Sequence, residues 1–196
     1  MHLSFSMTFV PIDTEAHAVV YEDECLSVAT LPMRHRIPCA GYLFTERPRR
    51  ANLIKEKLPE GLTPAQLGRL AQGEDLPATA SHPAVRHADV SAPAPTPRRY
   101  AFCSDTLYTP ALAELVRGAD VLYHEATFLE EMRERAAHTF HSTARQAAQL
   151  GHDAQVGRLL IGHFSSRYKS MEPLLEEAQA VFPTAELALE GLVVKL

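Results

Sequence analysis

The feature that most limits the possible folds of this chain is the alternation of apolar and amphipathic segments after residue 99. The strings YAFCSDT, DVLYHEAT and RLLIGHFSS each contain a short apolar run that favours a β-strand. Helical patterns lie between and after them, in TPALAELVRGA, in residues 128–136 and 142–150, and in MEPLLEEAQAVF. Strands that alternate with helices indicate an α/β layer structure, in which the helices pack on a sheet.

The first half of the chain has a different pattern. Three strands are predicted between residues 17 and 44, in AHAVVYED, CLSVATLPM and CAGYLFTE. Two short helices follow, in ANLIKEKL and in TPAQLGRLAQG, where Thr63 can cap the helix and Gly73 can end it. Five prolines between residues 77 and 98 predict a long surface loop. The C-terminal string AELALEGLVVKL predicts one or two closing strands.

The composition is that of an ordinary globular domain, with 46% hydrophobic and 22% charged residues. A formal net charge of -5 excludes a protein that holds nucleic acid by bulk positive charge. No apolar run reaches the roughly 18 residues of a membrane span, so we expect that the chain is not a membrane protein. The N-terminus lacks the pattern of a secretory signal, which favours the cytoplasm. The three cysteines form no C-x-x-C pair, which argues against a zinc ribbon.

Polar side chains follow three of the predicted strands, where each strand ends. Asp105 follows the first, His124 and Glu125 end the second, and His163 follows the third. Because strand ends in an α/β sheet direct side chains into a common crevice, these residues form a candidate metal site. Zinc binds imidazole nitrogens and carboxylate oxygens, and two zinc ions that share a carboxylate suit the hydrolysis of a phosphodiester.

Each of these residues also has an ordinary structural interpretation when it is taken alone. Asp105 could be a turn residue or a helix cap, and His163 a hydrogen-bonded histidine at a strand end. His141 precedes Ser142 and Thr143, either of which could cap a helix. His35, within MRHRIP, carries no signal by itself. The order and wording of the strings around these residues are what favour the functional interpretation.

Five strings between residues 33 and 168 resemble those of ribonuclease Z, the tRNA 3′-end processing endonuclease family of the metallo-β-lactamase superfamily. In chain order they are PMRHRIPCAGYLFTERP, YAFCSDT, LYHEATF, HSTARQAA and LLIGHFSSRY. The resemblance implies an α/β fold of the αββα sandwich type. Residues 1–196 would supply roughly the C-terminal half of that domain, and residues 47–98 would form an arm inserted in it.

The resemblance also implies roles for individual residues. His35 would bind one zinc ion, His163 the other, and Asp105 would bridge both. Glu125 and His141 would act as a pair at the leaving group, where a charged imidazole can donate a proton to the departing 3′-oxygen. Weaker assignments are contacts of Ser165 and Arg167 with the substrate phosphate, and of basic arm residues with the backbone of precursor tRNA. These arm residues, which could equally be a solvated charge cluster, are Arg47, Arg49, Arg50 and Lys55.

The sequence departs from the family in one respect, because members carry an H-x-H-x-D-H motif that supplies further zinc ligands and the general base. No such string occurs in this chain. We therefore expect an incomplete zinc site, little activity of the chain alone, and a partner that is either the missing N-terminal half or a full-length subunit. The complete enzyme is expected to be a homodimer. Two alternatives remain, a non-catalytic fragment that binds tRNA or a subunit, and a different phosphodiesterase of the same superfamily.

Overall fold

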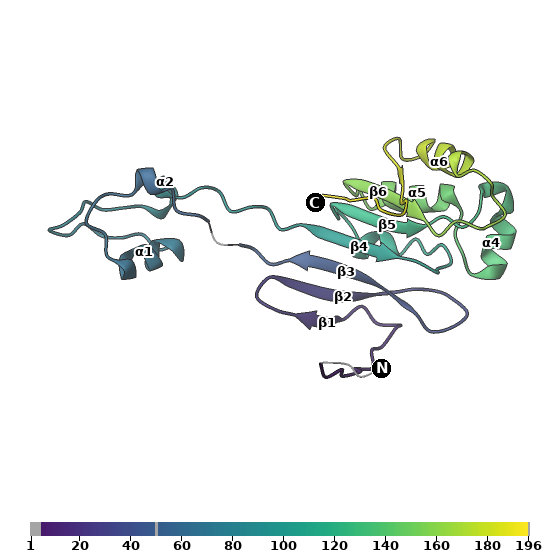
Figure 1. The fold of residues 1–196 in the computed structure, drawn as a ribbon, viewed down its shortest axis with the longest axis horizontal. Coiled ribbons are helices and arrows are strands. Elements are labelled where there is room, and N and C mark those ends of the chain that lie inside the picture. Colours follow the sequence, from purple (N-terminus) through teal and green to yellow (C-terminus); the bar gives the residue numbers. More distant parts are fainter. Residues whose placement is uncertain (1–4, 50, 196) are drawn as a thin grey trace. The chain divides into compact units, whose positions relative to one another are not determined.

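The computed structural model describes residues 5–49 and 51–195, which divide into two compact units (Figure 1). The first unit comprises the chain up to Thr45 and from Arg98 onward, and the second comprises Glu46–Pro97.

The first unit is built on one seven-stranded sheet in which the strands follow chain order (Figure 1). The pairs β1 with β2 and β3 with β4 are antiparallel, whereas β4, β5, β6 and β7 are parallel neighbours. The sequence predicted all seven positions, although β7 is shorter than expected. The strands are β1 (Val19–Glu22), β2 (Leu26–Pro32), β3 (Ala40–Glu46), β4 (Arg99–Cys103), β5 (Val121–Glu125), β6 (Arg158–Gly162) and β7 (Glu186–Leu187).

The helices of this unit lie between and after the parallel strands. The longest, α5, begins where Thr143 and Gln146 form a capping box, so the prediction of a cap at this point is confirmed. The helix predicted from residue 128 begins later, because Phe128 forms a parallel bridge with Thr143 and only the residues beyond it coil. The helices are α3 (Leu112–Leu115), the 3-10 turn η2 (Glu130–Met132), α4 (Arg133–Thr139), α5 (Ala144–Asp153) and α6 (Glu172–Gln179).

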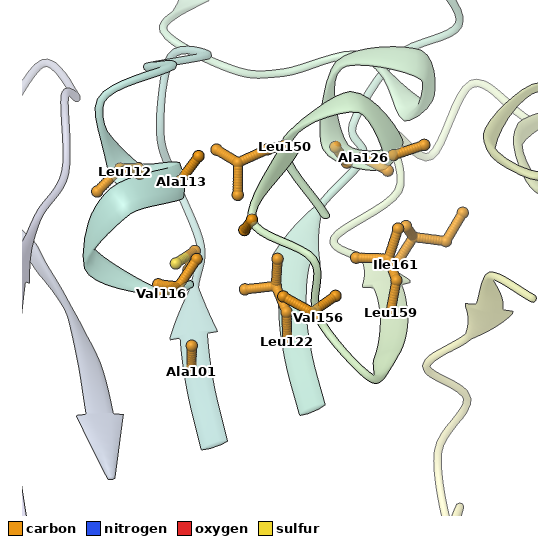
Figure 2. Close-up of a cluster of buried hydrophobic side chains, with 14 of the residues drawn as sticks. Ala101, Leu112, Ala113, Val116, Leu122, Ala126, Leu150, Val156, Leu159 and Ile161 are labelled. Carbon is orange, nitrogen blue, oxygen red and sulfur yellow. The ribbon is translucent and has the colours of Figure 1, made fainter. Parts of the chain in front are cut away.

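The main hydrophobic core lies between one face of the sheet and the helices (Figure 2). Leu122 of β5 and Ile161 of β6 meet Leu112 of α3 and Leu150 of α5 there, and all four are essentially inaccessible to solvent. On the other face, Phe44 of β3 and Phe102 of β4 are each 37% exposed, whereas Val121 of β5 and Leu160 of β6 are buried. The sheet is therefore closely covered on the helix face, and its other face is accessible at β3 and β4.

The second unit has a small core of its own. Its elements are the 3-10 turn η1 (Lys55–Lys57), α1 (Pro64–Ala71) and α2 (His87–Val90), and α1 begins at the predicted Thr63 cap. The helix predicted in ANLIKEKL is wrong apart from η1, because Leu53 pairs with Ser91 in an antiparallel bridge. The predicted loop is also partly wrong, since it contains α2 and a bridge from Val85 to Leu76. None of the helices in the described ranges is long and apolar enough to cross a membrane.

Leu70 is the fully buried centre of this small core, where it packs with Leu76, Val85 and Val90. We expect Leu70→Ala to lower the free energy of unfolding of this unit by about 2 to 5 kcal/mol, the usual cost of a cavity. So small a core cannot absorb that loss, so residues 46–97 should lose their amide protection against hydrogen exchange. The first unit should keep its protection in the same experiment, and equal loss in both units would contradict two separate cores.

Candidate metal and catalytic site

The carboxyl ends of the three parallel strands β4, β5 and β6 bring the predicted site residues together. Asp105 follows β4, Glu125 ends β5 and His163 follows β6, and His141 precedes α5. One ligand atom from each of these four residues lies within 4.8 Å of those of the others. Asp105 and His163 have φ angles of 53° and 57°, a left-handed conformation that is uncommon outside glycine, although Asp and His adopt it more readily than most residues. Strained backbone of this kind concentrates at functional sites.

Glu125 is fully buried and accepts four hydrogen bonds. Its Oε1 accepts from the Thr106 amide at 2.6 Å and from His141 Nδ1 at 3.0 Å. Its Oε2 accepts from the Thr127 hydroxyl at 2.5 Å and from the Ser142 amide at 3.0 Å. Burial alone would raise the pKa of this carboxyl, but the hydrogen bonds together outweigh burial and lower it. Because its oxygens are occupied, Glu125 serves as an anchor for its neighbours.

His141 is the hydrogen-bond partner of that anchor. Its Nδ1 donates to Glu125, and this hydrogen bond raises the pKa of the imidazole, while burial acts in the opposite direction. This leaves the other ring nitrogen, Nε2, for an interaction with another group. The ring lies between two other imidazoles, with centroids 5.2 Å from His35 and 5.3 Å from His163. A protonated ring in this position can donate a proton to a neighbouring group.

The contacts of Thr127 determine how His163 is protonated. A hydroxyl has one proton, and Thr127 Oγ1 can donate it to the Glu125 carboxylate at 2.5 Å or to the His163 carbonyl oxygen at 3.0 Å, in either case to an oxygen. Thr127 Oγ1 must then accept from His163 Nδ1 at 2.9 Å, which makes Nδ1 the donor. His163 Nε2 faces Asp105 Oδ1 at 3.0 Å. Two groups that both carry lone pairs approach so closely only when a proton or a metal cation lies between them.

His35 lies in the loop between β2 and β3. Its Nδ1 donates to the Phe140 carbonyl oxygen at 3.1 Å, and the ring lines a cavity of about 630 Å³ with Arg34, Arg36 and Phe140. His35, His141 and His163 thus each have Nδ1 bonded to an oxygen, and Nε2 of His163 faces the Asp105 carboxylate. A second-shell oxygen on one ring nitrogen is the usual arrangement of a histidine that binds metal through the other. Together with the Asp105 carboxylate, this set of donors fits zinc.

The weaker assignments lie outside that group of four. Arg167 Nε donates to Ser165 Oγ at 3.1 Å, and the guanidinium lies 5.1 Å above the centre of the Phe128 ring, which itself contacts His141. This places both residues beside the strand ends. In the second unit, Arg47 and Lys55 are exposed and Arg49 forms an exposed ion pair with Glu46. Arg50 lies outside the described residues.

Sequence reasoning did not identify the residues that hold the site together. Thr127 connects Glu125 to His163, while the amides of Thr106 and Ser142 bind the same carboxylate. Thr127 belongs to the string LYHEATF, so the signal was present in the sequence. Its role depends on a contact between side chains 36 positions apart, which no local pattern reveals.

The stability contributed by the pair of Glu125 and His141 should depend on pH in a defined way. The lowered pKa of Glu125 gives stability that is lost as pH falls below its ordinary 4.5 and through the folded value. The raised pKa of His141 gives stability that is present below its ordinary 6.5 and lost as pH rises through the folded value. Urea denaturation at a series of pH values should show the difference between wild type and His141→Gln shrinking above that pH. A difference that grows as pH rises would contradict the raised pKa.

Comparisons with known proteins agree with this geometry. Residues 78–164 match the family model described as "Beta-lactamase superfamily domain". Ribonuclease Z of Parabacteroides distasonis is 44% identical over 191 residues, which is 97% of this chain and 62% of that protein. Ribonuclease Z of Porphyromonas gingivalis is 44% identical over 186 residues, which is 94% of this chain and 61% of that protein. The chain thus spans less than two thirds of the length of these relatives.

Two solved structures share the fold. The metallo-β-lactamase fold protein YhfI of Bacillus subtilis is 14% identical with a TM-score of 0.59, covering 93% of this chain and 54% of that one. The short form of human tRNase Z is 20% identical with a TM-score of 0.53, covering 90% of this chain and 46% of that one. The motifs, the strand-end site and these comparisons together identify the chain as a homologue of ribonuclease Z with a metallo-β-lactamase-like fold.

Proposed function

We propose that this chain provides part of the active site of a zinc-dependent endoribonuclease that removes the 3′ trailer of precursor tRNA. The observation that carries the proposal is the convergence of Asp105, Glu125, His141 and His163 within 4.8 Å at the ends of three parallel strands. The similarity to proteins named Ribonuclease Z supports the reaction and the substrate. A cytoplasmic location agrees with such a substrate.

In this proposal His35, Asp105 and His163 would hold the metal, which when bound activates water and polarises the phosphate. His141, kept charged by Glu125, donates its proton to the departing 3′-oxygen. Glu125 orients that ring and is itself fixed by backbone amides, so the proton is held where the bond breaks. Near the phosphate, Arg167 offers a guanidinium whose fork matches phosphate oxygens, and Ser165 orients it.

The proposed site needs more ligands than this chain brings together. A zinc ion in proteins takes three or four protein ligands, so two ions need more donors than His35, Asp105 and His163. We propose that the others come from a polypeptide equivalent to the remainder of the relatives' length, either a separate N-terminal half or a full-length subunit. The accessible face of the sheet, with Phe44 and Phe102, is the apolar surface on which it would pack. The complete enzyme would be a homodimer.

The basic residues of the second unit are proposed to contact the tRNA backbone. Near the start of the sequence of that unit stand Arg47, Arg49, Arg50 and Lys55, and contacts of such residues with phosphates position RNA without reading its sequence. Residues 46–97 would thus serve as the inserted arm of the nuclease.

The isolated chain is expected to be largely free of metal after purification. With only two ligands for each ion, Asp105 being shared, zinc would keep water in its remaining positions, and its affinity should be weaker by orders of magnitude than that of a complete site. Elemental analysis after dialysis against a weak chelator measures this. Close to two zinc ions per chain would mean that other side chains complete the site.

Cleavage of precursor tRNA with zinc, with and without an added N-terminal segment of a ribonuclease Z relative, tests the proposal. We expect cleavage at the 3′ trailer only when both polypeptides are present. His141→Ala should slow it without changing metal content, whereas His152→Ala, at an exposed histidine of α5, should leave both unchanged. Binding of tRNA without cleavage in the assembled pair would instead favour the non-catalytic role.

A further inference from the structure

The side chain of Tyr123 connects the two strand ends from which Asp105 and His163 project. Tyr123 lies on β5 between β4 and β6, where its register partners are Phe102 and Leu160. Its phenol reaches two residues beyond each partner. On β6 it meets Gly162, which precedes His163, and on β4 it meets Ser104, which precedes Asp105.

Contact with Gly162 is close enough to exclude any larger residue there. A Cβ atom built on Gly162 would lie 2.5 Å from the phenol oxygen and 2.7 Å from Cε2 of Tyr123. The ring therefore occupies the space that a side chain at position 162 would need, and it rests on the backbone that leads into His163. His163, the next residue, has the left-handed backbone conformation, with φ of 57°.

On the other side, the ring is held by β4. The Phe102 ring stacks on that of Tyr123 with centroids 4.8 Å apart and planes at 13°. The phenol also interacts with the side chain of Ser104, and burial raises the pKa of Tyr123, so the phenol stays protonated at neutral pH. Asp105, the next residue along the chain, is also left-handed, with φ of 53°.

Two strained residues that must face each other need surroundings that hold them, since neither backbone conformation is favoured by itself. We propose that Tyr123 is a positioning residue, which fixes the separation of the Asp105 carboxylate and the His163 imidazole by packing between Ser104 and Gly162. This inference rests on the proposed function, in which that carboxylate and imidazole hold metal. It assigns a role to a residue that touches neither the metal nor the substrate.

The test compares Tyr123→Phe, which removes only the hydroxyl, with Gly162→Ala, which places a methyl group where the phenol lies. Tyr100→Phe is the matched control. Tyr100 lies on β4, on the same face of the sheet as Tyr123, and it stacks on Phe44 as Tyr123 stacks on Phe102, with centroids 5.7 Å apart. The first readout is the ¹⁵N resonance of the His163 ring nitrogens in the metal-free chain. The second is a zinc titration, monitored by the same resonances, of the chain assembled with an N-terminal segment of a ribonuclease Z relative.

In the wild type and in Tyr100→Phe, Nδ1 of His163 should show the resonance of a protonated, hydrogen-bonded nitrogen. Tyr123→Phe and Gly162→Ala should shift it as the contact with Thr127 loosens, and zinc should bind about tenfold more weakly, as for other residues behind metal ligands. If Gly162→Ala does not fold, Tyr123→Phe decides alone. Unchanged ring resonances in folded variants would overturn the role of Tyr123. If the resonances of the assembled wild type do not respond to zinc, the metal site is wrong, whereas the metal-free spectra still test the role of Tyr123.

Discussion

Replacing Glu125 with alanine is expected to lower the free energy of unfolding of the first unit by about 3 to 5 kcal/mol, the range found when one partner of a buried pair is removed. The carboxylate is fully buried and accepts four hydrogen bonds. Its loss leaves the amides of Thr106 and Ser142 buried without acceptors, and each such donor is costly. Denaturation by urea, followed by circular dichroism, measures the change.

A control variant tests whether the loss of stability comes from the burial of the carboxylate or only from the loss of its charge. Glu114→Ala removes a carboxylate that pairs with Arg117 at the surface, where water can replace the lost contact. It should leave the denaturation midpoint almost unchanged. If Glu125→Ala were equally harmless, the hydrogen-bond network could not be what holds the site together.

Asp105→Asn is expected to weaken zinc binding of the assembled enzyme by at least about a hundredfold and to reduce cleavage below detection. Asparagine has nearly the same volume as aspartate and also tolerates the left-handed conformation, so the backbone should not change. What is lost is the negative charge that faces His163 Nε2 at 3.0 Å. Metal content by elemental analysis and the cleavage rate should fall together.

The matched control for this change is Asp153→Asn, at an aspartate that ends α5 and pairs with His152 on the surface. It should retain both metal and activity. Full metal content in Asp105→Asn, at an unchanged rate, would remove Asp105 from the metal site and leave His163 paired with it for structural reasons alone.

Local sequence determined most of the secondary structure of this protein. The strands from β1 to β6 were predicted because apolar runs of strand length were separated by turn residues, and α1 and α5 because Thr63 and Thr143 are strong caps. The errors lie in the second unit, where Leu53 and Val85 form bridges to distant partners. Pairing between segments overrode the local preference for helix or loop there.

The site divides in the same way. The predicted strand ends let Asp105, Glu125 and His163 be named from sequence, because parallel strands end at one edge of a sheet, whereas His141 was named from the resemblance. The contacts that define how these side chains work together could not be predicted from the sequence. That Glu125 is saturated, that Thr127 sets the protonation of His163, and that Tyr123 spans two strand ends depend on contacts between residues far apart in the chain. Such contacts exist only once the sheet has formed, because hydrogen bonds and close packing are fixed by distances in space rather than by spacing along the sequence.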